Sequence, residues 1–342
     1  MSKKIAVLGC GAIGSSVSAD LTDAGLDVTI IDQWPAHVEV MKANGLHIEM
    51  PDLDLKIPVR AYHLCELASL KLEFDIVFLA VKSYDNPWML QLIKPYLKSD
   101  GVLVGLQNSM NEELSISVLG PERVVGAVIE LSGEIFTPGK VQRNTSRTGT
   151  WFGVGEIDGT ITPRVQEIQS ILSNVAEVDI HPNIYSAKWT KLIVNSMSMG
   201  PFGVTGLKKM EASYLPEMQE LAMRLGKEAI EVGTAIGYGV EPVFGLDSDE
   251  IAGPDEQVLN TLSQTLFHHT GSKSRTAPIQ DHLKGRKNEI EFINGLVARR
   301  GKEAGVPTPC NDAVAEIARQ INQGQLEMDP SNFEVLLDKV RP

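Results

Sequence analysis

Short, almost continuous apolar runs alternate with helical patterns through the first half of the chain. Runs of this kind are typical of strands buried on both faces of a parallel sheet, and their alternation with helices predicts βαβ units. The predicted strands are residues 5–8, 28–32, 74–81 and 101–106. Between them, Pro35 favours the start of a helix that stops near Asn44 and Gly45, and the alternation over residues 46–61 predicts a small hairpin.

The second half of the chain, from about residue 185, consists of one helical pattern after another. Apolar residues recur every three or four positions along a long helix, at Met218, Leu221, Leu225, Ala229, Val232 and Ile236. A second helix, ending near Gly305, is marked by Ile290, Ile293, Leu296 and Val297. Pro307 and Pro309 interrupt the chain, and Asn311 is expected to cap a last helix that ends near Gly324. The acidic segment 247–256 is predicted to be an exposed connection.

The length of the chain, 342 residues, suggests two domains that each bury a core. Together with the change of pattern, it predicts an α/β domain over residues 1–183 and an all-helical domain over residues 184–342. The composition, 43% hydrophobic and 22% charged, is that of an ordinary globular protein.

Charge and cysteine content exclude several function classes. With a formal net charge of −13 and no segregated basic run, the chain lacks the electrostatic footprint of a nucleic-acid-binding protein. Cys10, Cys65 and Cys310 are far apart, which favours a reducing compartment and offers no metal-like spacing. No run reaches the roughly 18 apolar residues of a membrane span, and the basic start precedes an apolar stretch too short for a signal peptide. We therefore expect a cytoplasmic protein that binds neither nucleic acid, membrane nor metal.

The first predicted strand leads into a glycine-rich turn of the form G-x-G-x-x-G. Its residues are Gly9, Cys10, Gly11, Ala12, Ile13 and Gly14. In dinucleotide-binding proteins the first glycine allows a tight turn, the second lets the backbone approach the pyrophosphate, and the third lets the next helix pack closely on the sheet. The phosphates then lie at the helix N-terminus, where free N–H groups favour anions. All six residues are therefore expected to bind the cofactor.

The second predicted strand ends in Asp32, at the distance from the glycine turn where an acidic residue contacts the adenosine ribose. A carboxylate accepts hydrogen bonds from both ribose hydroxyls and repels a 2′-phosphate. Asp32, followed by Gln33, therefore predicts a preference for NAD(H), with NADP(H) as the alternative.

Polar residues also follow the third and fourth predicted strands. Lys82 and Ser83 come after the third strand, and residues 107–109, which include Asn108, come after the fourth. Because ligands of open α/β sheets bind outside the carboxyl ends of the strands, we expect both segments to face the same crevice as the glycine turn.

Lys191, Asn195 and Met199 are four residues apart and fall roughly on one face of a predicted helix. The flanking residues 192–194 are apolar, so this helix is largely buried and a lysine in it needs a reason. Reduction of a ketone by hydride leaves negative charge on the oxygen, and a lysine can supply the proton that this oxygen takes up. Spacing alone leaves open whether Lys191 is catalytic or solvated.

Several motifs, in order along nearly the whole chain, resemble those of the ketopantoate reductase family. They are the glycine turn, Val81-Lys82, Gln107-Asn108, Lys191-Leu192-Ile193-Val194-Asn195, Gln280-Asp281 and Glu289-Ile290-Glu291-Phe292-Ile293-Asn294-Gly295. The resemblance implies a Rossmann-type dinucleotide-binding domain and an all-helical domain like the C-terminal domain of 6-phosphogluconate dehydrogenase, with the active site between them and pairing into a homodimer. It also implies an NAD(P)-dependent oxidoreductase acting on CH–OH groups.

The same resemblance implies roles for individual residues. Lys191 would polarise the ketone and protonate the forming alkoxide, and Glu289 would be a second catalytic residue. Asn108, Asn195 and Glu289 would position the substrate or the nicotinamide ribose, and Lys82 would lie near the cofactor. Other interpretations remain: Lys82 as an ordinary strand-end lysine, Glu289 as an acid placed for its helix dipole, and residues 294–295 as a packing feature.

The chain departs from the family pattern at positions that contact substrate there. Met199 stands at the family's second asparagine, and Thr276 and Ala277 stand at its pair of serines. Loss of one partner of a buried polar pair costs about 1–3 kcal/mol, so these replacements predict poor recognition of ketopantoate and a substrate more apolar at the Met199 end. Thr276, Ser274 or Arg275 would compensate at the substrate's carboxylate. Ser109 replaces a family glycine, and Asp32 stands where typical members carry a basic residue.

These features predict hydride transfer between NAD(P)H and the C2 carbonyl of a small 2-oxo acid, or the 2-hydroxy acid in reverse. One alternative is an authentic NADPH-dependent 2-dehydropantoate 2-reductase of pantothenate biosynthesis. Another is a non-catalytic dinucleotide-binding sensor, which would not need a proton donor. A histidine mechanism of the malate dehydrogenase type would use His268, His269 or His282, but none has a paired acid at suitable spacing.

Overall fold

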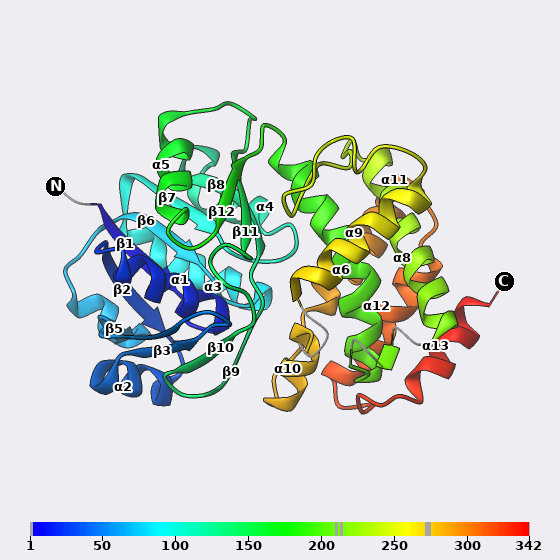
Figure 1. Ribbon diagram of the computed structural model, residues 1–342, viewed down its shortest axis with the longest axis horizontal. Helices are drawn as coiled ribbons and strands as arrows, with labels where there is room; N and C mark the ends of the chain where they lie inside the picture. Colours follow the sequence, from blue (N-terminus) through cyan, green and yellow to red (C-terminus); the bar gives the residue numbers. More distant parts are fainter. Residues whose placement is uncertain (1–2, 209–210, 213–214, 271–274, 342) are drawn as a thin grey trace. The chain divides into compact units, whose positions relative to one another are not determined.

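The computed structural model describes residues 3–208, 211–212, 215–270 and 275–341, without the side chains of residues 268–270 (Figure 1). The chain divides into two compact units, Met1–Ile184 and Tyr185–Pro342. The first is an α/β unit and the second is helical, as the sequence pattern predicts.

An eight-stranded sheet forms the centre of the first unit. Its strands are, in spatial order, β12 (Glu177–Ile180), β11 (Trp151–Glu156), β8 (Val124–Glu130), β7 (Leu97–Gly105), β6 (Phe74–Leu79), β1 (Lys4–Leu8), β2 (Asp27–Asp32) and β5 (Ala61–His63). The strands from β8 to β5 are parallel, whereas β11 and β12 run in the opposite direction. The chain moves outward from β1 through β2 to β5 and returns to β6 on the other side of β1. The switch point of the sheet, where such folds bind ligands, therefore lies between β1 and β6.

A second, four-stranded sheet has the order β4 (Asp54–Ile57), β3 (Leu46–Glu49), β10 (Lys140–Arg143) and β9 (Gly133–Thr137). β3 and β4 form the hairpin expected over residues 46–61, and β10 adds to β3 in parallel. The helix α1 (Ala12–Asp23) lies between the sheets, because it contacts β1 and β2 of the large sheet and all four strands of the small one.

Both faces of the large sheet are buried, which explains why its strands are apolar without alternation. On β1, Ile5 and Val7 belong to a core shared with α1, the small sheet and α5 (Pro163–Leu172). Ala6 and Leu8 belong to the opposite core, shared with α3 (Asn86–Ile93) and α4 (Glu112–Leu119). The remaining helices of this unit are α2 (Pro35–Asn44) and the 3-10 helices η1 (Leu64–Ser69), η2 (Ser83–Asp85), η3 (Lys94–Tyr96) and η4 (Pro121–Arg123).

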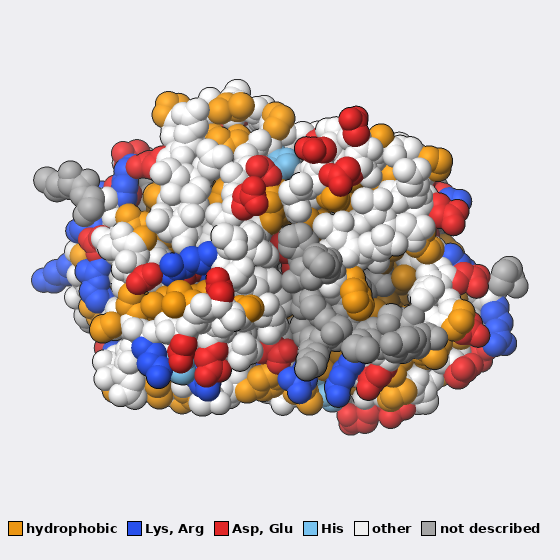
Figure 2. All heavy atoms as spheres, in the orientation of Figure 1, with side chains coloured by type: hydrophobic (Ala, Val, Ile, Leu, Met, Phe, Trp, Pro, Cys, Tyr) orange, Lys and Arg blue, Asp and Glu red, His pale blue; other side chains and the backbone are white. Residues whose placement is uncertain are grey.

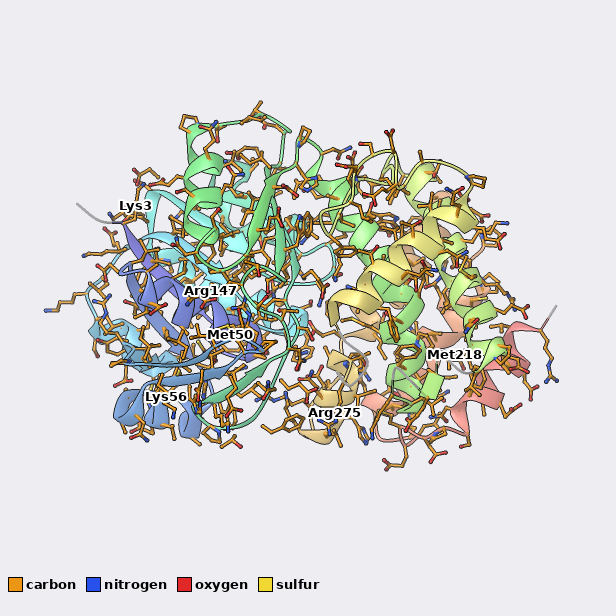
Figure 3. The ribbon with its side chains drawn as sticks, viewed as in Figure 1. Lys3, Met50, Lys56, Arg147, Met218 and Arg275 are labelled. Atoms are coloured by element: carbon orange, nitrogen blue, oxygen red, sulfur yellow. The ribbon has the colours of Figure 1, made fainter. Side chains whose placement is uncertain are left out.

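A fully buried ion pair ties β10 to α1. Arg143 Nη1 donates to Asp20 Oδ2 at 2.5 Å, and both side chains are 0% exposed. The other oxygen of Asp20 accepts from Arg147 Nε at 2.8 Å, and the Arg147 side chain, labelled in Figure 3, is 34% exposed. Arg143 Nη2 also donates to Thr150 Oγ1 and to the Val175 carbonyl, both at 2.9 Å. These bonds hold the segment after β10 against α1.

The second unit is built from helices. They are α6 (Ile184–Thr205), α8 (Pro216–Ala235), α9 (Asp255–Thr270), α10 (Ala277–Leu283), α11 (Asn294–Ala304), α12 (Pro309–Asn322) and α13 (Asn332–Val340), with the 3-10 helix η5 (Ile290–Phe292). α8, α11 and α12 pack pairwise, α13 packs on α12, and α9 packs on α8. The predicted apolar stripe of α8 is buried from Met218 to Val232. No helix within the described ranges is long and apolar enough to span a bilayer.

The structure corrects three helix predictions in this unit. The helix expected to start at Ile290 starts at Asn294, because the residues before it form the tighter turn η5. The N-cap of α12 is Thr308, and Asn311 lies in the first turn of the helix. α12 is also not the last helix, since α13 follows it.

Basic and acidic side chains are interspersed on the described surface drawn in Figure 2. The acidic segment expected to be an exposed connection forms turns from Asp247 to Glu250, and Asp255 and Glu256 begin α9. The exposure of this segment is as predicted.

Candidate active site

The glycine turn after β1 has the geometry that a bound pyrophosphate requires. Gly9 has φ +92°, and a Cβ there would lie 2.9 Å from the Val81 backbone nitrogen. A Cβ on Gly14 would overlap the carbonyl oxygen of Gly9. A Cβ on Gly11, in contrast, would meet no protein atom within 4 Å, so only this glycine borders open space. The turn is thus tight where it meets the sheet and open where a ligand would approach.

The start of α1 supplies the donors for such a ligand. Gly11 is its N-cap, it has no side chain to cap the helix, and the first turn carries no acidic residue. The Ser15 N–H donates to the Gly11 carbonyl at 3.0 Å, so the N–H groups of residues 12–14 have no acceptor within the helix. Open space above Gly11 and free helix donors beside it together fit the pyrophosphate of a dinucleotide.

Asp32 ends β2 beside this turn and is only 6% exposed. The Cys10 N–H donates to its Oδ2 at 2.5 Å, and the Trp34 N–H donates to its Oδ1 at 2.7 Å. A carboxylate has about four acceptor sites, so these two bonds fix its orientation and leave acceptor capacity for ribose hydroxyls. The neighbouring Gln33 is exposed and donates to Asp85 Oδ2 at 3.1 Å.

A buried histidine that was not predicted from the sequence, His37, is connected to the glycine turn by hydrogen bonds. The Gly139 N–H donates to His37 Nδ1 at 2.8 Å, which leaves the His37 proton on Nε2, 3.2 Å from Ser15 Oγ. Ser15 Oγ in turn donates to the Cys10 carbonyl at 3.0 Å, while the Cys10 N–H binds Asp32. A continuous chain of hydrogen bonds therefore runs from the β9–β10 hairpin to the carboxylate of Asp32.

Burial lowers the pKa of His37 below its ordinary value of 6.5, although the nearby Asp32 carboxylate and the Cys10 backbone oppose the shift. The indole of Trp34 stacks on its ring at 5.3 Å between centroids. Burial also raises the pKa of the Cys10 thiol, and the Asp32 charge adds to that effect. No sequence signal pointed to His37, because an isolated histidine on an amphipathic helix is common.

The polar segments after β6 and β7 lie at neighbouring strand ends, as predicted. β1, β6 and β7 are paired in register, Leu8 with Leu79 and Leu79 with Gly105. Lys82 after β6 and Asn108 after β7 are half-buried. Gln107 Nε2 donates to the Val81 carbonyl at 2.6 Å and to Asn86 Oδ1 at 2.8 Å, so it joins the two segments.

Ser109, which stands where the family has glycine, has φ +73°. This left-handed conformation is unfavourable for residues with a Cβ and favours glycine. The resemblance therefore identified a position with a real backbone requirement, which the chain meets at a cost in strain.

In the second unit, the predicted substrate residues of α6 follow one another along the helix. Lys191 is 5% exposed, and its Nζ lies 4.8 Å from the centroid of the Phe244 ring. Asn195, one turn further, is 0% exposed, and Met199, another turn on, is half-buried. The helix is thus largely buried, as its sequence predicts.

Thr276 and Ala277 lie at the start of α10, Thr276 as its N-cap. The buried Thr276 hydroxyl has no hydrogen-bond partner among the described residues. Arg275, labelled in Figure 3, is exposed, and its carbonyl accepts from Gln280 Nε2 at 3.1 Å. Ser274 lies outside the described residues.

Glu289 is half-buried and sits at the N-cap position of the 3-10 helix η5, before α11. Its neighbour Asn288 is fixed on both sides: the Asn288 N–H donates to Asn322 Oδ1 at 2.9 Å, and Asn288 Oδ1 accepts from the Ile290 N–H at 3.1 Å. Glu289 is therefore held at the start of a short turn rather than inside the first turn of an α-helix.

Asn294 has the packing role that the sequence left open. Its Nδ2 donates to the Ser196 carbonyl of α6 at 3.0 Å and to Asn311 Oδ1 of α12 at 2.9 Å. Asn311 Nδ2 donates to Glu228 Oε2 of α8 at 2.8 Å, and Glu228 also accepts the backbone N–H groups of Cys310 and Asn311. This network joins the helix that carries Lys191 to α8, α11 and α12.

The histidines of the alternative mechanism gain no support. His282 is half-buried near the end of α10, and His268 and His269 lie in α9 with side chains outside the described part. Among the described residues, no group of three or more His, Cys, Asp or Glu side chains is arranged to hold a metal ion.

Comparison with known proteins agrees with this architecture. The sequence matches the family models "Ketopantoate reductase PanE/ApbA" over residues 5–156 and "Ketopantoate reductase PanE/ApbA C terminal" over residues 183–322. It is 29% identical to the 2-dehydropantoate 2-reductase of Pyrococcus horikoshii, over 90% of this chain and 94% of that protein. It is 24% identical to the 2-dehydropantoate 2-reductase of Archaeoglobus fulgidus, over 94% of this chain and 99% of that protein.

Solved structures show the same fold. A D-mandelate dehydrogenase in a ternary structure with NADH and anilino(oxo)acetate superposes with a TM-score of 0.82 at 21% identity, over 94% of this chain and 99% of that one. A PanE/ApbA family ketopantoate reductase from Ralstonia eutropha JMP134 gives a TM-score of 0.78 at 26% identity, over 94% of this chain and 99% of that one. The chain therefore belongs to the ketopantoate reductase family of oxidoreductases.

Proposed function

We propose that this protein transfers hydride between NAD(H) and the C2 carbonyl of a small 2-oxo acid, or the 2-hydroxy acid in reverse. The observation that carries the proposal is a glycine turn open only at Gly11, next to an acid at the end of β2. Family membership supports the reaction class, and the side chains at Asp32, Met199 and Ala277 support the choice of cofactor and substrate.

The cofactor preference rests on the charge of Asp32. The N–H groups of Cys10 and Trp34 hold its carboxylate beside the glycine turn, where it would repel a 2′-phosphate on the adenosine ribose. That juxtaposition favours two ribose hydroxyls over a phosphate. Residues 9–14, Gln33, Lys82, Asn108 and Glu289 complete the proposed cofactor contacts.

The bound dinucleotide would supply the hydride. Lys191 would donate a hydrogen bond to the substrate's ketone oxygen, stabilise the charge that develops there, and transfer its proton to the resulting alkoxide. Asn195 and Asn108 would orient the substrate, and Glu289 would position the substrate or the nicotinamide ribose. In the oxidative direction, neutral Lys191 would take the hydroxyl proton.

The substrate would be less polar than ketopantoate at one end. Met199 offers no hydrogen bond where the family has an asparagine, and Ala277 offers none where it has a serine. The buried hydroxyl of Thr276, without a partner among the described residues, would take the substrate's carboxylate. D-mandelate dehydrogenase, whose fold this chain shares, is named for a hydroxy acid that carries an apolar phenyl group.

A second candidate is an NADPH-dependent 2-dehydropantoate 2-reductase. It is favoured by the names of the curated relatives, which cover nearly the whole chain. The two candidates differ in cofactor and substrate but share the reaction, so one experiment separates them. A non-catalytic sensor would show binding without turnover.

The test is a two-way screen of NADH and NADPH against ketopantoate and other 2-oxo acids, with NAD and NADP against the corresponding 2-hydroxy acids. We expect the highest kcat/KM with NADH and an apolar 2-oxo acid. Highest activity with NADPH and ketopantoate would establish the second candidate, and dinucleotide binding without turnover on any acid would establish the sensor.

Lys191→Ala should leave the Kd for NADH within about twofold and lower kcat by about a hundredfold or more, the usual scale for an acid–base group. Calorimetric titration with NADH and steady-state kinetics measure the two effects. Lys188→Ala, a second buried lysine of α6, is the matched control and should lower kcat less. Unchanged turnover in Lys191→Ala would remove this lysine from the mechanism.

Asp32→Ser removes the charge but keeps an acceptor for the Cys10 N–H. We expect the ratio of kcat/KM for NADPH to that for NADH to rise by about tenfold or more. Asp100→Ser is the control, because Asp100 is exposed and lies in the first half of β7, away from the strand's carboxyl end. An unchanged ratio in Asp32→Ser would mean that another residue selects the cofactor.

The proposed oligomeric state is a homodimer formed through the helical unit, as the resemblance to the family implies. Light scattering coupled to size-exclusion chromatography measures the mass of the protein in solution, which should be twice the 37.3 kDa of one chain.

A further inference from the structure

The connection between α8 and α9 follows the surface of α6, the helix that carries Lys191. The Gly239 N–H donates to Ser186 Oγ at 3.2 Å, and the Glu241 N–H donates to Thr190 Oγ1 at 2.9 Å. Ser186 and Thr190 are one helical turn apart, so two successive turns of α6 each bind one backbone group of the connection. The segment is thereby fixed in register with the helix.

Aromatic contacts fix the start of the same connection. The Tyr238 ring stacks on Tyr185 with 5.9 Å between centroids and lies against Trp189 at 5.7 Å. Trp189 is itself anchored, because its Nε1 donates to the Ala229 carbonyl of α8 at 2.9 Å. The connection is therefore attached to α6 by side-chain packing as well as by hydrogen bonds.

Further along this connection, Phe244 has a backbone conformation that is unfavourable for it. Its φ is +64°, followed by +76° at Gly245, and only 4% of the residue is exposed. Val243 before it is 0% exposed, which anchors the segment. Residues other than glycine adopt left-handed conformations only where the surroundings enforce them, and such residues cluster at functional sites.

The strained backbone directs the ring of Phe244 to the ammonium of Lys191. Nζ lies 4.8 Å from the ring centroid, within the range of about 6 Å for a cation–π contact. A ring face attracts a cation but cannot accept its proton or neutralise its charge, as a carboxylate would. Such a neighbour restrains the ammonium while it remains an acid.

We propose that Phe244 is a positioning residue, which holds the Lys191 ammonium in the orientation needed to protonate the substrate oxygen. The proposal rests on the function proposed above for Lys191. The strain at Phe244 and the hydrogen bonds of Gly239 and Glu241 to α6 are the structural means by which the ring is kept over Nζ.

The kinetic test compares Phe244→Leu, which keeps an apolar side chain but removes the ring, with Phe244→Tyr, which keeps the ring. We expect Phe244→Leu to lower kcat about tenfold with an unchanged KM for NADH, and Phe244→Tyr to restore kcat to within about threefold. Phe333→Leu removes a similarly buried ring from the core of α13 and should leave kcat unchanged. Equal kcat in Phe244→Leu and wild type, or an equal loss in Phe333→Leu, would overturn the proposal.

A second measurement does not depend on turnover. In protein labelled with ¹³C-lysine, the Hε protons of Lys191 should resonate upfield because the adjacent Nζ lies over a ring face, and Lys191→Arg assigns the signal. Phe244→Tyr should keep this upfield shift, whereas an unshifted Lys191 signal in wild type would refute the contact itself. Full turnover in Lys191→Ala would instead refute the function proposed for Lys191, and the ring-current result would be unaffected.

Discussion

The buried pair of Arg143 and Asp20 gives a direct test of the energetics of the first unit. Arg143→Met replaces a guanidinium that is 0% exposed by an apolar side chain. Asp20, also 0% exposed, then keeps an ion pair with Arg147 and loses the one with Arg143. Breaking a buried ion pair by removing one member costs about 3–5 kcal/mol, because the other charge stays in a site of low polarity.

Two features of the site adjust this value. Burial raises the pKa of Asp20 even though both arginines favour its charged form, so desolvation dominates here and Arg147 alone compensates poorly. The Val175 carbonyl also loses the Nη2 donor of Arg143, and an unsatisfied buried acceptor costs about 1–3 kcal/mol. We therefore expect Arg143→Met to lower the free energy of unfolding by about 4 kcal/mol or more.

Urea denaturation followed by tryptophan fluorescence measures the change, since Trp34, Trp88 and Trp151 report on this unit. Arg147→Met is the control: it alters the same carboxylate from a position that is 34% exposed and should cost about 1 kcal/mol. Arg143→Met combined with Asp20→Leu should cost less than Arg143→Met alone, because no buried charge is then left. A loss below about 1 kcal/mol for Arg143→Met, or a double variant as unstable as the sum of the two single ones, would refute the reasoning.

Two further predictions concern the supports of the cofactor site. Ser109→Gly should raise the free energy of unfolding by up to about 1 kcal/mol, since glycine takes φ +73° without strain; a lower melting temperature would mean that contacts of the serine side chain outweigh the strain. Because burial holds the pKa of His37 below 6.5, its contribution to stability is complete above pH 6.5 and is lost as the pH falls from there through the lower folded-state pKa. Urea midpoints between about pH 7.5 and 5.5 should fall more steeply in wild type than in His37→Gln, and parallel slopes would show that His37 is not the group that titrates.

The sequence predicted the four central strands of the large sheet, β1, β2, β6 and β7, because each is an apolar run that ends at a glycine or polar segment. It did not predict β5, β8, β11 or β12. The strand before Gly9 buries apolar side chains on both faces of the sheet. In the turn that follows, a Cβ on Gly9 or Gly14 would overlap other atoms, so these two positions require glycine. The polar segments after β6 and β7 could be placed beside that turn from the general rule that strand ends converge. The small sheet is different: the hairpin was evident, but the addition of β10 to β3 is a long-range pairing without a local signal.

The supports of the site were not predictable for the same reason. His37 acts through Gly139, 102 residues further on, and nothing in either local sequence indicates the contact. The sequence predicts Asn311 as a helix cap because asparagine is favoured there. Its side chain instead bonds Glu228 of another helix, and Glu228 accepts the N–H groups of Cys310 and Asn311 that a cap would have satisfied. Nothing in the sequence indicates the conformation of Phe244, since a positive φ cannot be inferred from a phenylalanine.

The pairing of β3 with β10 has a consequence for how the chain is assembled. His47 pairs with Lys140 and Ile48 pairs with Val141. During synthesis the β3–β4 hairpin is therefore made before its partner β10, and the edge of β3 stays unpaired until most of the first unit has left the ribosome. Until then the outward side of α1 is also uncovered, because the same sheet shields it. We expect fragments that end before β10 to self-associate, and this unit to fold in a single late step rather than strand by strand.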